Sequence, residues 1–119
     1  MSPTERTLRE CRRMGWTCAV VEKWNPHARI RQDLFGMFDV LALTPDGIVG
    51  IQCTTAAHMA ERARKLADNA ILTTWLEHAG AEVWGWLLRP RGRRKWELRR
   101  RRITPYENSA ANDDPAGGD

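Results

Sequence analysis

The chain has 119 residues, of which 42% are hydrophobic, and 19 basic against 15 acidic residues give a net charge of +4. This length fits one domain whose core can be stable without disulfides or metal staples, and the composition excludes a disordered chain. No apolar run approaches the ~20 residues of a membrane span, and the N-terminal residues lack the apolar region of a secretory signal. We therefore expect a cytoplasmic protein with no membrane partner.

The N-terminal part of the chain predicts one helix and one strand. Residues 4–14 have an apolar stripe typical of a helix, with Thr4 as the N-cap and Gly15 as the stop. Residues 16–21 are rich in β-branched and aromatic side chains and predict a strand. Residues 25–32 are polar, and we expect a loop there.

The middle of the chain predicts a hairpin followed by helix. Residues 36–43 and 48–54 read as two strands, joined by a turn at 44–47 that contains proline and glycine. From Thr55 the apolar residues recur with a helical period. Asp68 and Asn69 either end this helix or only weaken it, and residues 71–79 continue as helix.

Two further strands are expected at residues 82–88 and 95–103. The predicted order is helix, three strands, helix, two strands. This order predicts an α/β protein with a mixed sheet of four to five strands, flanked by the helices that start at Thr4 and Thr55. We expect one domain at residues 1–106, followed by a disordered acidic tail at 107–119.

Three cysteines occur, an odd number with no closely spaced pair: Cys11, Cys18 and Cys53. They predict reduced, buried thiols and argue against a zinc site or a disulfide framework. The tryptophans are mainly expected in the core, Trp16 and Trp75 among them. Trp24, beside a polar loop, is the one expected to be exposed.

The positive charge is concentrated in one segment. Residues 89–102 hold nine basic residues and a single acidic one, whereas residues 107–119 hold four acidic and no basic residues. A basic block of this kind indicates a polyanionic partner, DNA first, although a charged edge strand also protects against aggregation. The DNA contacts that we expect are Arg62, Arg89, Arg91, Arg93, Arg94, Lys95, Arg99, Arg100, Arg101 and Arg102.

A candidate site follows from polar residues inside the predicted hairpin. Asp39 lies in an apolar stretch, where a carboxylate is costly unless it is solvated, paired or bound to metal. Gln52 and Thr54 are two apart on the next strand and share a face. Their oxygens would suit Mg²⁺ or Mn²⁺. The alternative is that Asp39 caps a loop or pairs with an arginine, and that the other two are ordinary strand residues.

Residues 31–54, RQDLFGMFDVLALTPDGIVGIQCT, resemble the core motif of the PD-(D/E)XK nucleases. Asp39 takes the position of the motif's aspartate, Gln52 that of its acidic residue and Thr54 that of its lysine. The chain is most similar to the archaeal-type Holliday junction resolvase group, especially small phage and bacterial relatives with a KDLFGxxD…QxT pattern. The resemblance covers roughly residues 4–103 and implies a restriction-endonuclease-like αβββαβ core.

The resemblance also implies further site residues. In that group a glutamate on the first helix joins the metal site, which makes Glu5 a candidate here; Glu22, at the end of the first strand, is a second. Either could equally be a surface residue. Asp33 could bind a second metal ion or fix its loop, and we favour the loop role.

Two departures from the motif affect the expected chemistry. Gln52 can offer a metal only a neutral oxygen, and Thr54 cannot position or deprotonate a water as lysine does. Lys65 lies on the following helix, on one face with His58 and Arg62, and could replace the missing lysine. That face could also be simply a solvated basic surface.

The expected function is Mg²⁺- or Mn²⁺-dependent hydrolysis of phosphodiester bonds in DNA, including branched or Holliday-junction DNA. One alternative is an inactive DNA-binding module that retains the nuclease fold. Another is a basic structural protein in which Asp39 is incidental. The sequence leaves a homodimer open.

Overall fold

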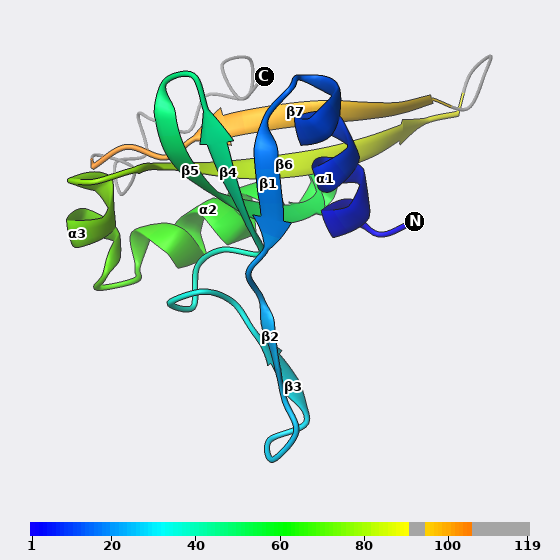
Figure 1. Cartoon of the computed structure of the whole chain (residues 1–119). Coiled ribbons are helices and arrows are strands. Elements are labelled where there is room, and N and C mark those ends of the chain that lie inside the picture. Colours follow the sequence, from blue (N-terminus) through cyan, green and yellow to red (C-terminus); the bar gives the residue numbers. More distant parts are fainter. Residues whose placement is uncertain (91–94, 106–119) are drawn as a thin grey trace.

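The computed structural model describes residues 1–90 and 95–105. The main sheet has five strands in the order β1-β4-β5-β6-β7 (Figure 1). Only the β5–β6 pair is parallel, so the sheet is mixed. The expected α/β class is confirmed, with a mixed five-stranded sheet flanked by helices. The elements are α1 (Pro3–Arg13), β1 (Thr17–Val20), β2 (Lys23–Asn25), β3 (Ile30–Gln32), β4 (Val40–Thr44), β5 (Gly47–Thr55), η1 (Ala56–His58), α2 (Met59–Ala67), α3 (Leu72–Leu76), β6 (Gly80–Arg89) and β7 (Lys95–Arg102).

Helix α1 begins earlier than predicted because Ser2, not Thr4, is its N-cap. Ser2 Oγ accepts a hydrogen bond of 3.1 Å from the Glu5 amide, and the Glu5 carboxylate accepts one of 3.2 Å from the Ser2 amide. This reciprocal capping box satisfies two amide groups that the helix itself cannot pair. The helix ends before Gly15, which has a φ of +80°.

The sheet separates two hydrophobic layers. On one face, Cys11 of α1 packs with Val40, Ile51 and the indoles of Trp84 and Trp86. On the other, α2 and α3 pack over a second set of buried residues, which includes Met37, Phe38, Met59, Ala63, Leu66, Leu72, Ala81, Val83 and Ile103. Strand β6 contributes to both layers because successive side chains point to opposite faces. The centre of the sheet is therefore covered on both sides.

The β4–β5 hairpin forms as expected, but its first strand is shorter. Strand β4 begins at Val40 because Phe35 and Gly36, with φ of +55° and +73°, turn the chain back on itself. This turn pairs Leu34 with Phe38 in an isolated bridge. Gly50 in β5 leaves room for the Phe38 ring, since a Cβ there would lie 2.6 Å from the ring. The chain therefore enters β4 from a tight loop packed onto the sheet.

The expected loop at residues 25–32 is instead part of a second, two-stranded sheet. Strands β2 and β3 pair antiparallel, with Trp24 opposite Arg31, and project from the body as an arm (Figure 1). The prediction missed them because short polar strands have no hydrophobic alternation. We call residues Lys23 to Gln32 the β2–β3 arm.

Several other expectations concern particular segments. No helix in the described part of the chain is long and apolar enough to cross a membrane. All three cysteines are free, and Cys11 and Cys53 are buried. Trp24 is exposed, as predicted. The predicted tail at 107–119, and the expected DNA contacts Arg91, Arg93 and Arg94, lie outside the described residues.

Candidate functional site

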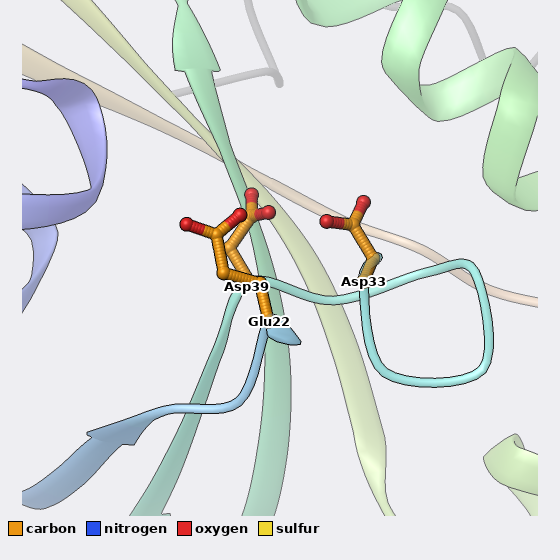
Figure 2. Close-up of side chains that lie close together, drawn as sticks. All are labelled: Glu22, Asp33 and Asp39. Atoms are coloured by element: carbon orange, nitrogen blue, oxygen red, sulfur yellow. The ribbon is translucent and has the colours of Figure 1, made fainter. Parts of the chain in front are cut away.

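Three carboxylates converge where the arm meets the main sheet. Glu22, Asp33 and Asp39 each place one carboxylate oxygen within 4.8 Å of the others (Figure 2). Glu22 lies between β1 and β2, Asp33 directly follows β3, and Asp39 directly precedes β4. Three segments separated in sequence thus build one acidic cluster.

Asp39 is held rigidly by main-chain hydrogen bonds on both sides. Its amide donates to the Ile51 carbonyl at 3.0 Å, and its carbonyl accepts from the Val21 amide at 2.8 Å. Its Oδ2 accepts a 2.8 Å hydrogen bond from the Cys53 amide. The Asp39 carboxylate therefore accepts a main-chain hydrogen bond from β5, which fixes its position beside the start of β4.

The environment of Asp39 disfavours its charged form. The residue is only 7% exposed. Burial raises the pKa of Asp39 to about 8, assisted by contact with the Asp33 carboxyl group and by the negative charges of Asp33 and Glu22, and opposed by the Cys53 amide. Two carboxylates in contact need a proton or a cation between them, because like charges at this separation repel strongly. The cluster is therefore a place where a cation would be stabilised.

Gln52 lies beside the cluster, but its oxygen points elsewhere. The β4–β5 register pairs Val40 with Ile51, so Asp39 and Gln52 lie on neighbouring segments as predicted. Gln52 Nε2 donates to Asp33 Oδ2 at 3.1 Å and to the Met37 carbonyl at 2.5 Å. Its Oε1 accepts from Arg62 Nη1 at 3.0 Å. In this arrangement Gln52 positions Asp33 instead of presenting the metal-binding oxygen expected from the sequence.

Arg62 explains this difference. It was expected on the DNA-binding surface, but it reaches from α2 toward the sheet and holds the buried Gln52 oxygen. Its Nε is buried and has no hydrogen-bond partner among the described residues. Arg62 is therefore connected to Asp33 through the Gln52 amide.

Lys65, the expected substitute for the motif lysine, lies at an open hollow next to the cluster. The hollow has a volume of about 580 Å³. Its lining consists of Arg31, Gln32, Asp33, Phe35, Gly36, Arg62 and Lys65. Lys65 is exposed there. In contrast, His58 Nδ1 lies 3.3 Å from the Thr55 hydroxyl, in the segment that connects β5 to α2. The three residues expected on one helix face therefore have different surroundings.

The remaining expected site residues separate into two groups. Glu22 belongs to the cluster and forms a 3.2 Å ion pair with Arg31. Glu5 is engaged in the capping box of α1 and is not part of the cluster. Thr54 is buried in β5, on the same face as Gln52 and opposite Gly85 of β6. Of the two candidate glutamates, the structure brings only Glu22 to Asp39.

Asp33 was assigned a loop role from the sequence, yet its carboxylate is part of the cluster. The available signal was Gly36 between Asp33 and Asp39, because a glycine with positive φ lets the chain fold back and bring both ends together. The turn does so through hydrogen bonds between Leu34 and Phe38.

The described part of the expected DNA surface is divided between structural and exposed residues. Arg100 pairs with the buried Glu82 through contacts of 2.9 and 3.2 Å and lies over the Trp84 ring. A buried carboxylate needs such a partner, so Arg100 is committed to the fold. Arg89 pairs with Glu97 at 2.7 Å, and Arg101 is half-buried. Lys95, Arg99 and Arg102 are exposed on β7, which lies at an edge of the sheet.

No protein-family model matches this chain, and neither a curated protein nor a solved structure matches it. Its function must therefore be argued from the site itself.

Proposed function

We propose that this protein is a metal-dependent endonuclease that hydrolyses phosphodiester bonds in DNA. The observation that carries the proposal is the convergence of Glu22, Asp33 and the buried Asp39 within 4.8 Å. Three carboxylate oxygens are a donor set that fits a hard cation such as Mg²⁺ or Mn²⁺. When bound, the cation would supply activation of the attacking water and charge stabilisation at the phosphate.

The chain's own residues would divide the remaining work. Asp39 would be a well-positioned ligand, because β5 and the segment after β1 both hold its main chain by hydrogen bonds. Gln52 donates a hydrogen bond to Asp33, and Arg62 holds the oxygen of the same Gln52 amide, so the two residues together position Asp33. Lys65 lies at the rim of the hollow, where an ammonium group can attract the phosphate and offset its charge. The hollow gives the DNA backbone access to Asp33.

The order of elements supports the same proposal. With the β2–β3 arm set aside, the chain runs helix, three antiparallel strands, helices, and then a strand parallel to β5. This is the αβββαβ order that the PD-(D/E)XK resemblance implies, with Asp39 directly before the second of the three strands and Gln52 in the third. We therefore include a restriction-endonuclease-like core in the proposal.

A second candidate is a DNA-binding module that has lost catalysis. It is favoured by two observations: the motif lysine is replaced by the buried Thr54, and the Gln52 oxygen is occupied by Arg62. Such a protein would still present the basic residues of β7 to phosphates.

The two candidates differ in Mg²⁺-dependent cleavage of DNA. We expect the wild type to cleave at least one of branched, flapped, duplex or single-stranded DNA with Mg²⁺ or Mn²⁺. Asp39→Asn should lower the rate by about 100-fold or more, because removing a catalytic charge typically costs this much. DNA binding in EDTA should persist, since without a bound cation the loss of an anion does not weaken the attraction to phosphates.

The matched control for that experiment is Asp46→Asn, which changes an exposed aspartate in the β4–β5 turn. It should cleave like the wild type. Equal cleavage by wild type and Asp39→Asn would refute the proposed mechanism. Binding without cleavage by either protein would favour the inactive module.

A further inference from the structure

The β2–β3 arm begins and ends at the acidic cluster. Glu22 immediately precedes Lys23, the first residue of β2, and Asp33 immediately follows Gln32, the last residue of β3. The two strands pair with each other and not with the main sheet (Figure 1). A molecule that contacts the base of the arm therefore lies next to the three carboxylates.

The arm exposes apolar surface that contributes to neither core. Trp24 is 54% exposed and Ile30 is 50% exposed, and neither belongs to the buried clusters. A single exposed apolar residue is common, but a tryptophan on a projecting ribbon offers a flat aromatic face to a partner.

The charge of the arm identifies the kind of partner. The arm contains three basic residues, Lys23, Arg29 and Arg31, and no acidic residue. Arg31 is paired with Glu22, whereas Lys23 and Arg29 form no ion pair with any other residue that the structure describes. Cations around an exposed indole are the combination that binds nucleic acid, because phosphates meet the cations and bases stack on the ring. An apolar protein surface would complement the indole alone.

Hydrogen bonds within the turn stabilise the arm's tip. Asn25 Oδ1 accepts hydrogen bonds from the His27 and Ala28 amides at 3.0 and 3.1 Å. Arg29 adopts a φ of +56°, a conformation that is costly for a residue with a side chain. The Asn25 hydrogen bonds offset this cost and favour one conformation of the turn, which lowers the entropy lost when a partner binds.

We propose that the β2–β3 arm binds DNA with accessible bases, such as branched or single-stranded DNA, by stacking Trp24 on a base while Lys23 and Arg29 contact phosphates. Its place beside the reacting phosphate rests on the proposed nuclease function, but its binding of DNA does not. The arm thereby selects the structure of the substrate, and the acidic cluster acts on the neighbouring phosphodiester.

The test is DNA binding in EDTA, where no cleavage occurs, with labelled single-stranded, branched and blunt duplex DNA. Trp24→Leu keeps an apolar side chain but removes the aromatic face. We expect it to weaken binding to single-stranded and branched DNA by about 5- to 100-fold, which corresponds to one stacked base, and to affect blunt duplex less. Trp24→Phe should recover much of the loss.

Each change in the arm has a control variant at an exposed position elsewhere: Leu43→Ala for the change at Trp24, and Arg12→Glu for the change at Lys23. Leu43→Ala removes a side chain that is 52% exposed in β4, and it should bind DNA like the wild type. Lys23→Glu should weaken binding to all three DNAs and reduce the salt dependence, whereas Arg12→Glu, on an exposed position of α1, should have a smaller effect.

The arm proposal is overturned if Trp24→Leu and Lys23→Glu bind all three DNAs like the wild type, or if the wild type binds none of them. It is also overturned if the arm variants convert a dimer to a monomer with unchanged DNA affinity. Failure of the nuclease proposal would give a different result. Trp24→Leu would then lose affinity for DNA, although the wild type cleaves none of the DNAs. Cleavage of branched DNA at the wild-type rate by both arm variants would overturn the proposal for the arm but would leave the nuclease proposal standing.

Discussion

Asp39 makes the stability of the metal-free protein depend on pH. Its pKa in the folded protein is raised from 3.8 to about 8, so between these values the folded state retains a proton that the unfolded state has lost. Stability that comes from the neutral carboxyl group is complete below about pH 4 and is lost as the pH rises through about 8.

We therefore expect the melting temperature in EDTA to fall between these pH values more steeply for the wild type than for Asp39→Asn. Thermal unfolding followed by circular dichroism across the range measures this difference. At about pH 8, Mg²⁺ should raise the melting temperature of the wild type and leave that of Asp39→Asn almost unchanged, because a cation can replace the lost proton. Parallel pH profiles of the two proteins would contradict this explanation of the cluster.

Gln52→Glu tests the neutral position of the cluster. The Gln52 Nε2 atom lies 3.1 Å from Asp33 Oδ2, and a carboxylate oxygen would take its place in the variant. Because the two carboxylates would repel each other, the metal-free protein should melt at a lower temperature. Its affinity for Mg²⁺ should rise by about tenfold or more, because a fourth negative charge attracts the cation at close range. Calorimetric titration measures the affinity, and an affinity equal to that of the wild type would place the cation away from Gln52.

At the scale of elements, helix α2 presents basic residues with different surroundings. Lys65 borders the hollow that contains Asp33, and its exposed neighbour Arg64 does not line that hollow. Lys65→Ala should lower the cleavage rate by about tenfold or more while Mg²⁺ affinity and stability stay close to wild type. Arg64→Ala is the matched control and should cleave normally. A similar loss in both variants would indicate a general effect of charge instead of a role for Lys65.

The sequence predicted the strands that are rich in apolar residues and the helices that have an apolar face, and missed the short strands without either pattern. Strands β4, β5 and β6 are apolar because both faces of the sheet are covered, and their positions followed from that composition. The β2–β3 arm is polar and held mainly by main-chain pairing, so hydrophobic periodicity contains no signal for it. The capping box at Ser2 was missed, although serine followed three residues later by glutamate is a known signal for the start of a helix.

The candidate site was predictable only in part, for the same physical reason. Asp39 stood out because a carboxylate in an apolar strand must be compensated. Asp33 and Glu22 lie in connections, where acidic residues are common, and only the fold brings them together. The direction of the Gln52 amide depends on Arg62, which approaches from a different element, so local spacing could not determine it.

For the whole molecule, the cluster, the hollow and the arm meet at one end of the main sheet. Asp33 belongs to the cluster, lines the hollow and directly follows the arm. The positive charge seen in the sequence lies partly on β7, at the edge of the sheet, where Arg100 serves the fold and Lys95, Arg99 and Arg102 are exposed.

The most direct test of the central claim is the binding of Mn²⁺ to the protein without DNA, measured by calorimetry and by the electron paramagnetic resonance of the free ion. The wild type should bind Mn²⁺, and Glu22→Gln, Asp33→Asn and Asp39→Asn should each weaken binding by about tenfold or more, because each removes one charged oxygen ligand. Glu5→Gln, which can maintain the capping box of α1, should bind like the wild type. Loss of binding in Glu5→Gln with full binding in Glu22→Gln, or wild-type affinity in all three cluster variants, would contradict the assignment of this site.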